Sequence, residues 1–305
     1  MAEAARLHRH AANRYIAVHQ VMWGVRYATG HGVPQNWVKA AQLFRLAADQ
    51  KHAEAQFQLG VCFWLGKGVP QDLAEAARFY RLAADQKHAR AQFLLGTCFA
   101  RGEGVPQDVA EAARFYRLAA DQKHAEAQFL LGVCFVEGIG VARDAAEAAR
   151  LFHLAADQKH ANAQCQLGLC FAEGIGVPQD VAEAARFYRL AADQKHADAQ
   201  CQLGLCFAEG IGVPQDVAEA ARFYRLAADQ KHANAQFQLG LCFAEGIGVP
   251  QDVAEAARFY RLAADQKHAR AQFLLGVCFV KGIGVARDVA EGARLFHLTA
   301  DRGWV

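Results

Sequence analysis

The sequence predicts an all-α fold, a solenoid of helix–turn–helix repeats, and three observations carry this prediction. The dipeptide Leu59-Gly60 returns 36 residues later as Leu95-Gly96 and then at the same interval as Leu131-Gly132, Leu167-Gly168, Leu203-Gly204, Leu239-Gly240 and Leu275-Gly276. Repeats with a period of 20–50 residues typically stack into solenoids. Within each repeat the apolar residues follow helical spacing rather than strand alternation. Turn and capping residues also return at fixed places between the two helical segments.

Residues 54–89 illustrate one repeat. The first predicted helix covers 54–65 and ends at the turn Gly66-Lys67-Gly68. Asp72 stands at an N-cap position with Glu75 three residues later, which is the pattern of a capping box. A second helix, 73–86, then follows, with its alanine and aromatic residues on one face.

This register divides most of the chain into eight tandem units. They are 18–53, 54–89, 90–125, 126–161, 162–197, 198–233, 234–269 and 270–305. Residues 1–17 align with the second helix of a repeat, and we expect a separate helix there. Two interpretations remain open: this segment is a capping helix with a diverged outer face, or the chain is a truncated product of a longer one.

Composition and charge narrow the possible functions. Apolar residues make up 53% of the chain, enough for a continuous core, and the net charge of +2 argues against nucleic acid as a partner. The sequence has no long apolar run of the membrane-spanning kind and no apolar segment of the signal-peptide kind. We therefore expect a cytoplasmic protein, unless the N-terminus is truncated.

The motifs resemble those of the Sel-one-like repeat family, α-solenoids related to tetratricopeptide repeats. Good examples are Ala125-Glu126-Ala127-Gln128 followed by Gly132, and Gly174-Ile175-Gly176-Val177-Pro178-Gln179-Asp180. The resemblance covers the whole chain and implies a right-handed superhelix that serves as an adaptor or scaffold for protein complexes. The chain departs from the family in two places. Phe79 stands where the family commonly has Trp, and Lys87-His88 occupies a turn that commonly contains Gly, so the lysine must accept a conformation that glycine adopts more easily.

Cysteine and histidine each form a column in the repeats. We interpret the cysteines as small buried side chains of a protein in a reduced compartment. Cys165 and Cys201 stand outside the column, at a position that holds Phe in other repeats. The histidines are read as exposed turn residues that help to cap helix ends, and they are His52, His88, His124, His160, His196, His232 and His268. A metal-binding His/Cys ladder is a weaker alternative, since one His per repeat does not supply three or four ligands to one ion.

A cysteine-rich branch of the family is associated with β-lactam binding and hydrolysis, and this gives the chain a rival, enzymatic interpretation. That branch carries paired cysteines in each repeat, and this chain lacks the pairing. It also contains no serine to act as a nucleophile. We therefore expect no enzymatic activity, no cofactor and no small-molecule substrate.

The positions that vary between otherwise similar repeats fall on one side of the first helix. They correspond to residues 54, 58, 61 and 65, and their spacing places them on one helix face. By analogy with tetratricopeptide arrays, that face is expected to line the concave surface and to bind a protein, as an extended peptide or a partner helix. The alternative is neutral drift on a solvated surface. The predicted contact residues, which we call the first-helix face, are Arg90, Leu94, Arg101, Glu137, Asn162, Gln166, Glu173, Asp198, Gln202, Glu209, Asn234, Gln238, Glu245, Arg270 and Lys281.

Overall fold

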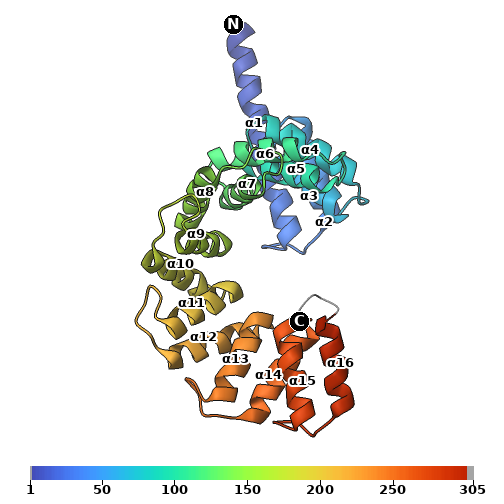
Figure 1. The fold of residues 1–305 in the computed structure, drawn as a ribbon. Coiled ribbons are helices and arrows are strands. Elements are labelled where there is room, and N and C mark those ends of the chain that lie inside the picture. The colour runs from blue at the N-terminus through green and yellow to red at the C-terminus, as the bar shows by residue number, and fades with distance from the viewer. Residues whose placement is uncertain (1, 301–305) are drawn as a thin grey trace. The chain divides into compact units, whose positions relative to one another are not determined.

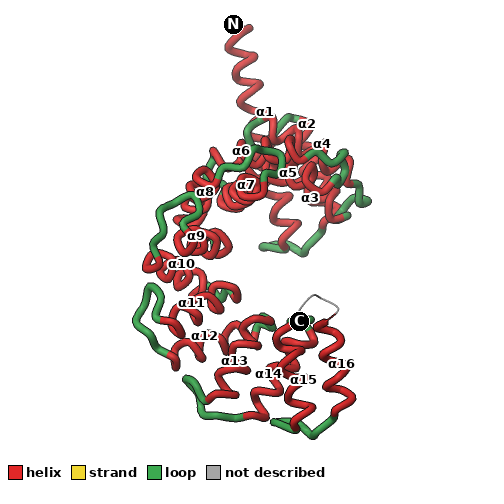
Figure 2. The backbone as a smooth tube through the Cα atoms, in the orientation of Figure 1, coloured by secondary structure: helices red, strands yellow, loops and turns green. Residues whose placement is uncertain are grey.

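Helices follow one another along the whole described part of the chain. The computed structural model describes residues 2–300, and within them it contains sixteen α-helices joined by loops, with no strand (Figures 1 and 2). The helices are α1 (Ala2–Thr29), α2 (Trp37–Asp49), α3 (Ala53–Leu65), α4 (Leu73–Asp85), α5 (Ala89–Arg101), α6 (Val109–Asp121), α7 (Ala125–Glu137), α8 (Ala145–Asp157), α9 (Ala161–Glu173), α10 (Val181–Asp193), α11 (Ala197–Glu209), α12 (Val217–Asp229), α13 (Ala233–Glu245), α14 (Val253–Asp265), α15 (Ala269–Lys281) and α16 (Val289–Ala300). The predicted all-α solenoid is confirmed.

The described part of the chain forms two compact units; the first ends at Ala155 and the second begins at Ala156. The same packing rule holds inside each of them. In the first unit α3 packs against α4 of its own repeat and against α2 of the preceding one, and in the second unit α11 packs against α12 and α10 in the same way. Each repeat therefore completes the core of its neighbour, as expected of a solenoid.

The N-terminal segment differs from the expectation. Residues 1–17 were expected to hold a helix separate from the first helix of the unit at 18, but α1 runs without a break from Ala2 to Thr29. The reason is local. Tyr15 and Ile16 stand where the other repeats have a turn lysine and a capping histidine, such as Lys87 and His88, so nothing ends the helix there.

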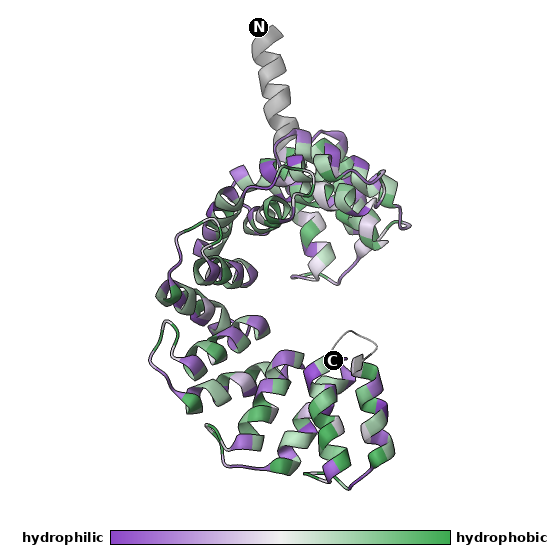
Figure 3. Cartoon of the chain, in the orientation of Figure 1, coloured by the Kyte–Doolittle hydropathy of each residue, from purple (hydrophilic) through white to green (hydrophobic). Residues whose placement is uncertain are grey.

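The Leu-Gly dipeptide marks the closest contact between the two helices of a repeat. A Cβ atom added to Gly60 would lie 2.7 Å from the ring of Tyr80 and 3.3 Å from the carbonyl oxygen of Ala76. Tyr80 is only 1% exposed, so its ring has no room to withdraw. Small residues at this place let the helix pair approach, while larger apolar residues fill the core around it. Figure 3 shows both apolar and polar residues on each described helix, as one buried and one solvated face require.

A buried glutamine joins each repeat to the one before it. The Gln56 side chain is 4% exposed; its Nε2 donates to the carbonyl oxygen of Ala48, at 3.4 Å, and its Oε1 accepts from Nε2 of Gln86, at 2.7 Å. The same arrangement returns in the second unit at Gln200. Because a buried amide without partners is costly, this position stays glutamine in repeat after repeat.

The turn after the second helix contains a lysine in the left-handed region. Lys87 has a φ of 61°. Its N–H donates to Ala84 O at 2.9 Å, and the N–H of His88 donates to Ala83 O at 3.1 Å, which together form a Schellman motif. The expected glycine-like turn conformation of the lysine is therefore confirmed, and it recurs at Lys51, Lys123, Lys159, Lys195, Lys231 and Lys267.

Replacing Gly60 with alanine is expected to destabilise the first unit. Alanine gains about 1 kcal/mol of helix propensity over glycine, but overpacking against Tyr80 costs about 1–3 kcal/mol. We expect a lower urea midpoint in circular dichroism. In a Tyr80→Ala background, where the ring is gone, Gly60→Ala should no longer lower the midpoint; an equal loss in both backgrounds would show that the ring contact is not the cause.

Replacing Lys87 with glycine is expected to stabilise the fold by about 0.5–1 kcal/mol. Glycine adopts the left-handed conformation without the steric cost that lysine has. This gain in folding free energy exceeds the loss caused by the greater entropy of glycine in the unfolded chain. Thermal unfolding of Lys87→Gly should show a higher midpoint. Lys87→Ala is the matched control, because it removes the same side chain and keeps the strain. Equal midpoints for the two variants would contradict this account.

Candidate functional site

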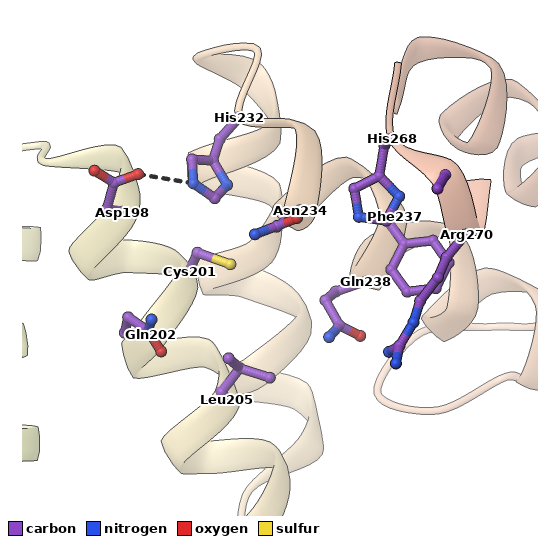
Figure 4. A pocket seen from close by; sticks show the side chains of 11 residues that line it. Asp198, Cys201, Gln202, Leu205, His232, Asn234, Phe237, Gln238, His268 and Arg270 are labelled. Carbon is purple, nitrogen blue, oxygen red and sulfur yellow. Dashed lines mark hydrogen bonds and ion pairs between the residues drawn. The ribbon is translucent and has the colours of Figure 1, made fainter. Parts of the chain in front are cut away.

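The first-helix face is accessible in both units. Each of its residues is exposed or half-buried, and none is in the core. In the second unit, five of its residues line one pocket with a volume of about 510 Å³. Figure 4 shows the lining side chains, which come from α11, α13, the start of α15 and the turns before α13 and α15. The lining residues are Asp198, Cys201, Gln202, Leu205, His232, Asn234, Phe237, Gln238, His268, Ala269 and Arg270.

Three side-chain amides in this pocket have no internal hydrogen-bond partner among the described residues. They belong to Gln202, Asn234 and Gln238. The equivalent glutamine in the first unit is different, because Gln58 donates to Glu54 Oε1 at 2.7 Å. Each amide offers two donors and an acceptor, so the three can hydrogen-bond to a polar ligand.

The histidines at the pocket rim link neighbouring repeats. His232 caps α13: its Nδ1 accepts from the N–H of Ala235 at 3.1 Å. Because Nδ1 is the acceptor, Nε2 carries the proton and donates to Asp198 Oδ1 at 2.8 Å, on the first helix of the same repeat. Equivalent links join His88 to Glu54 at 2.9 Å and His196 to Asn162 at 2.9 Å. Asp198 and Asn162 therefore have a structural role besides any contact with a partner.

The predicted capping role of the histidines is confirmed for the first helices, but the expectation that they are exposed was wrong. The side chains of His88 and His232 are only 16% and 19% exposed. Some of these rings stack on a phenylalanine, as His268 does on Phe237. The sequence contained a sign of these histidine hydrogen bonds. In each of the three cases an acidic or amide residue stands 34 positions before the histidine.

Some residues of the predicted first-helix face lie together at the pocket, and others lie outside it. Asp198, Gln202, Asn234, Gln238 and Arg270 meet at the pocket. Residues at the ends of first helices lie outside its lining, and these are Glu173, Glu209, Glu245 and Lys281.

In the first unit, a predicted face residue packs against the core. The Arg90 guanidinium lies over the Phe57 ring, 4.7 Å from its centroid. Sequence reasoning missed the aromatic and sulfur side of the pocket because Cys201, Phe237 and His268 were assigned to the core or to turns.

All nine cysteines are free. Burial raises the pKa of the Cys165 and Cys201 thiols to about 12, so both stay protonated at neutral pH. The rival β-lactam-active interpretation calls for disulfides, which these free thiols do not form. Among the described residues, no group of three or more His, Cys, Asp or Glu side chains is placed to hold a metal ion.

Comparison with known families gives eight consecutive matches to the Sel1 repeat, at residues 20–52, 53–88, 89–124, 125–160, 161–196, 197–232, 233–268 and 269–304. The chain belongs to the Sel1-repeat family. The family register begins each later repeat one residue before the predicted units, so that the helix-capping histidine closes one repeat and the next starts at the alanine after it.

Two solved Sel1-type structures are similar over nearly the whole chain. One is a protective antigen of uropathogenic Escherichia coli strains that displays an SLR fold; the chains are 33% identical with a TM-score of 0.86, over 94% of this chain and 62% of the antigen. The other is a Sel1 repeat protein from Oxalobacter formigenes, 29% identical with a TM-score of 0.73, over 98% of this chain and 86% of that one. The comparison with curated proteins gave no match.

Sel1-repeat proteins are generally protein-interaction scaffolds, and their solenoid is typically non-catalytic. No helix in the described part of this Sel1-repeat chain combines the length and apolar character needed to cross a bilayer. The functional question is therefore which part of the solenoid contacts a partner.

The histidine caps are expected to make this Sel1-repeat array acid-sensitive. Burial holds the pKa of His124, His196 and His268 below the usual value of 6.5. A depressed folded-state pKa means that the neutral form is the stabilising one. Its contribution is complete above pH 6.5 and is lost as the pH falls toward the lower, folded-state pKa, because a protonated Nδ1 no longer accepts the capping N–H.

Thermal midpoints measured between pH 7.5 and pH 5 should therefore fall with pH. The triple variant His124→Asn, His196→Asn and His268→Asn keeps an N-cap acceptor without a titrating ring, and its midpoint should fall less. The same slope in both proteins would show that other groups cause the acid sensitivity.

Proposed function

We propose that this Sel1-repeat protein is an adaptor that binds an extended peptide segment of a partner protein across the pocket on α11, α13 and α15. The observation that carries the proposal is the group of three unpaired amides, Gln202, Asn234 and Gln238, on one pocket lining. An extended segment leaves its main-chain N–H and C=O groups unpaired, and these amides supply partners for them.

A partner helix fits this lining less well. The main-chain groups in the middle of a helix already bond to one another, so a helix would leave the amides without partners. The apolar part of the pocket, with Leu205 and the Phe237 ring, provides the area that peptide side chains bury.

Charge at the two ends of the pocket gives the segment a preferred direction. Asp198 stands on the α11 side and remains 68% exposed even though it bonds to His232. Arg270 stands on the α15 side. We expect a segment with a basic residue toward Asp198 and an acidic residue toward Arg270, since complementary charges favour correct orientation.

The test begins with random peptides displayed on phage and selected on the purified full chain. Selected peptides are synthesised, and their affinities are measured by fluorescence anisotropy. The triple variant Gln202→Ala, Asn234→Ala and Gln238→Ala should bind them about 100-fold more weakly, because each hydrogen bond contributes about 1 kcal/mol. Truncating these exposed or half-buried side chains should leave the fold intact.

Arg222→Ala is the control for this test. Arg222 lies on α12, pairs with Glu219 at 2.8 Å and is not in the pocket lining. The affinity of the Arg222→Ala variant for the selected peptides should match that of the unchanged protein. Charge reversal at Glu173, Glu209 and Glu245 tests the wider first-helix face, and these changes should weaken binding less than the amide changes do. Equal binding by the amide variant, or failure to select any peptide, would refute the proposed site.

A further inference from the structure

One position of the first helix distinguishes the pocket from the corresponding place in other repeats. That position, which we call the ring position, holds phenylalanine at Phe57, Phe93 and Phe237. Each of these rings stacks on the histidine that closes its repeat and caps the first helix of the next one. The ring centroids are 4.8 Å apart for Phe57 and His88, 4.8 Å for Phe93 and His124, and 4.7 Å for Phe237 and His268.

Cys201 replaces the phenylalanine in the repeat that begins at α11. The histidine that the missing ring would cover, His232, is still held in place. Its Nδ1 caps α13 and its Nε2 bonds to Asp198, so the imidazole is fixed by hydrogen bonds on both nitrogens. Its face lines the pocket together with Cys201 (Figure 4). The repeat thus retains the stacking surface and lacks the ring.

We infer that the pocket takes an aromatic side chain, phenylalanine or tyrosine, from the bound segment. This inference rests on the proposed function and names the side chain that anchors the peptide. The guest ring would stack on His232 above Cys201, in the place that Phe57, Phe93 and Phe237 fill in their own repeats.

The chemistry of the walls suits such a guest. Leu205 and the Phe237 ring are apolar, and Cys201 is a small, soft side chain that contacts rings favourably. The volume of about 510 Å³ falls within the roughly 300–1,000 Å³ of small-molecule sites, which leaves room for a ring and the backbone that carries it. A buried aromatic side chain also removes a large apolar area from water, which makes it a strong anchor.

Cys165 holds the ring position one repeat earlier, where His196 is fixed in the same way, by Ala199 and Asn162. The experiment is therefore done in the full chain with Cys165→Phe, so that only the Cys201 site remains. The probe is N-acetyl-L-phenylalaninamide, titrated by saturation-transfer NMR. N-acetyl-L-leucinamide and N-acetylglycinamide are the matched non-aromatic probes.

The phenylalanine probe should bind at least about tenfold more tightly than the leucine probe. Cys201→Ala keeps the pocket open and should retain the binding. Cys201→Phe should lose it about tenfold or more, because the protein's own ring then covers His232. Phenylalanine is already the residue at this position in other repeats, so the variant should fold, which a thermal melt verifies.

A second variant guards against an indirect effect. His232→Asn retains an N-cap acceptor and removes the stacking face, and it should also lose the probe. Equal binding of the leucine probe, full binding by Cys201→Phe, or no binding of the phenylalanine probe would each overturn the inference. Phage-selected peptides that depend on Gln202, Asn234 and Gln238 but bind Cys201→Phe unchanged would leave the proposed function standing and refute the aromatic anchor alone.

Discussion

The interface between one repeat and the next is the constraint on which the rest of this structure depends. A helix pair of this size cannot bury its apolar face alone, so each repeat is stable only against its neighbours. Two polar side chains fix the register of that interface. A buried glutamine such as Gln200 bonds to Ala192 of the preceding repeat. A histidine such as His232 bonds to Asp198 of its own repeat and caps α13 of the next one. Both are satisfied, so they specify one alignment of the stack without leaving a buried polar group unpaired.

This constraint also explains which positions are free to differ. The buried glutamine and the capping histidine serve the interfaces and the Leu-Gly contact serves the helix pair, so from residue 52 to residue 276 they return at every repeat. The variable positions on the first-helix face are exposed or half-buried. Only the first of them in a repeat, such as Asn162 or Asp198, bonds to a capping histidine. The remaining face positions can therefore change without changing how the array folds.

Much of the fold was predictable from the sequence, and much less of the site. The helix pairs, their caps and the turn lysines follow from spacing and from residue types that have one main local use. The pocket does not follow in this way, because Cys201, His232 and Phe237 come from two repeats and each has a good local explanation as core or cap. The prediction of a separate helix at residues 1–17 was wrong for a related reason. It assumed the inter-repeat turn of the other repeats, but Tyr15 and Ile16 are not turn residues, and α1 continues through them.

The pocket differs from the equivalent places in other repeats by a smaller side chain at the ring position. Residues 162–197 and 198–233 are near copies, so they share the cysteine in the ring position and the histidine that follows. The histidine stays in each of them because it caps the next first helix and bonds to the first helix of its own repeat. With cysteine in place of phenylalanine, the imidazole of His232 keeps its position but has no ring of its own repeat stacked on it. The same hydrogen bonds that stack the repeats thus preorganise the surface that a partner would meet.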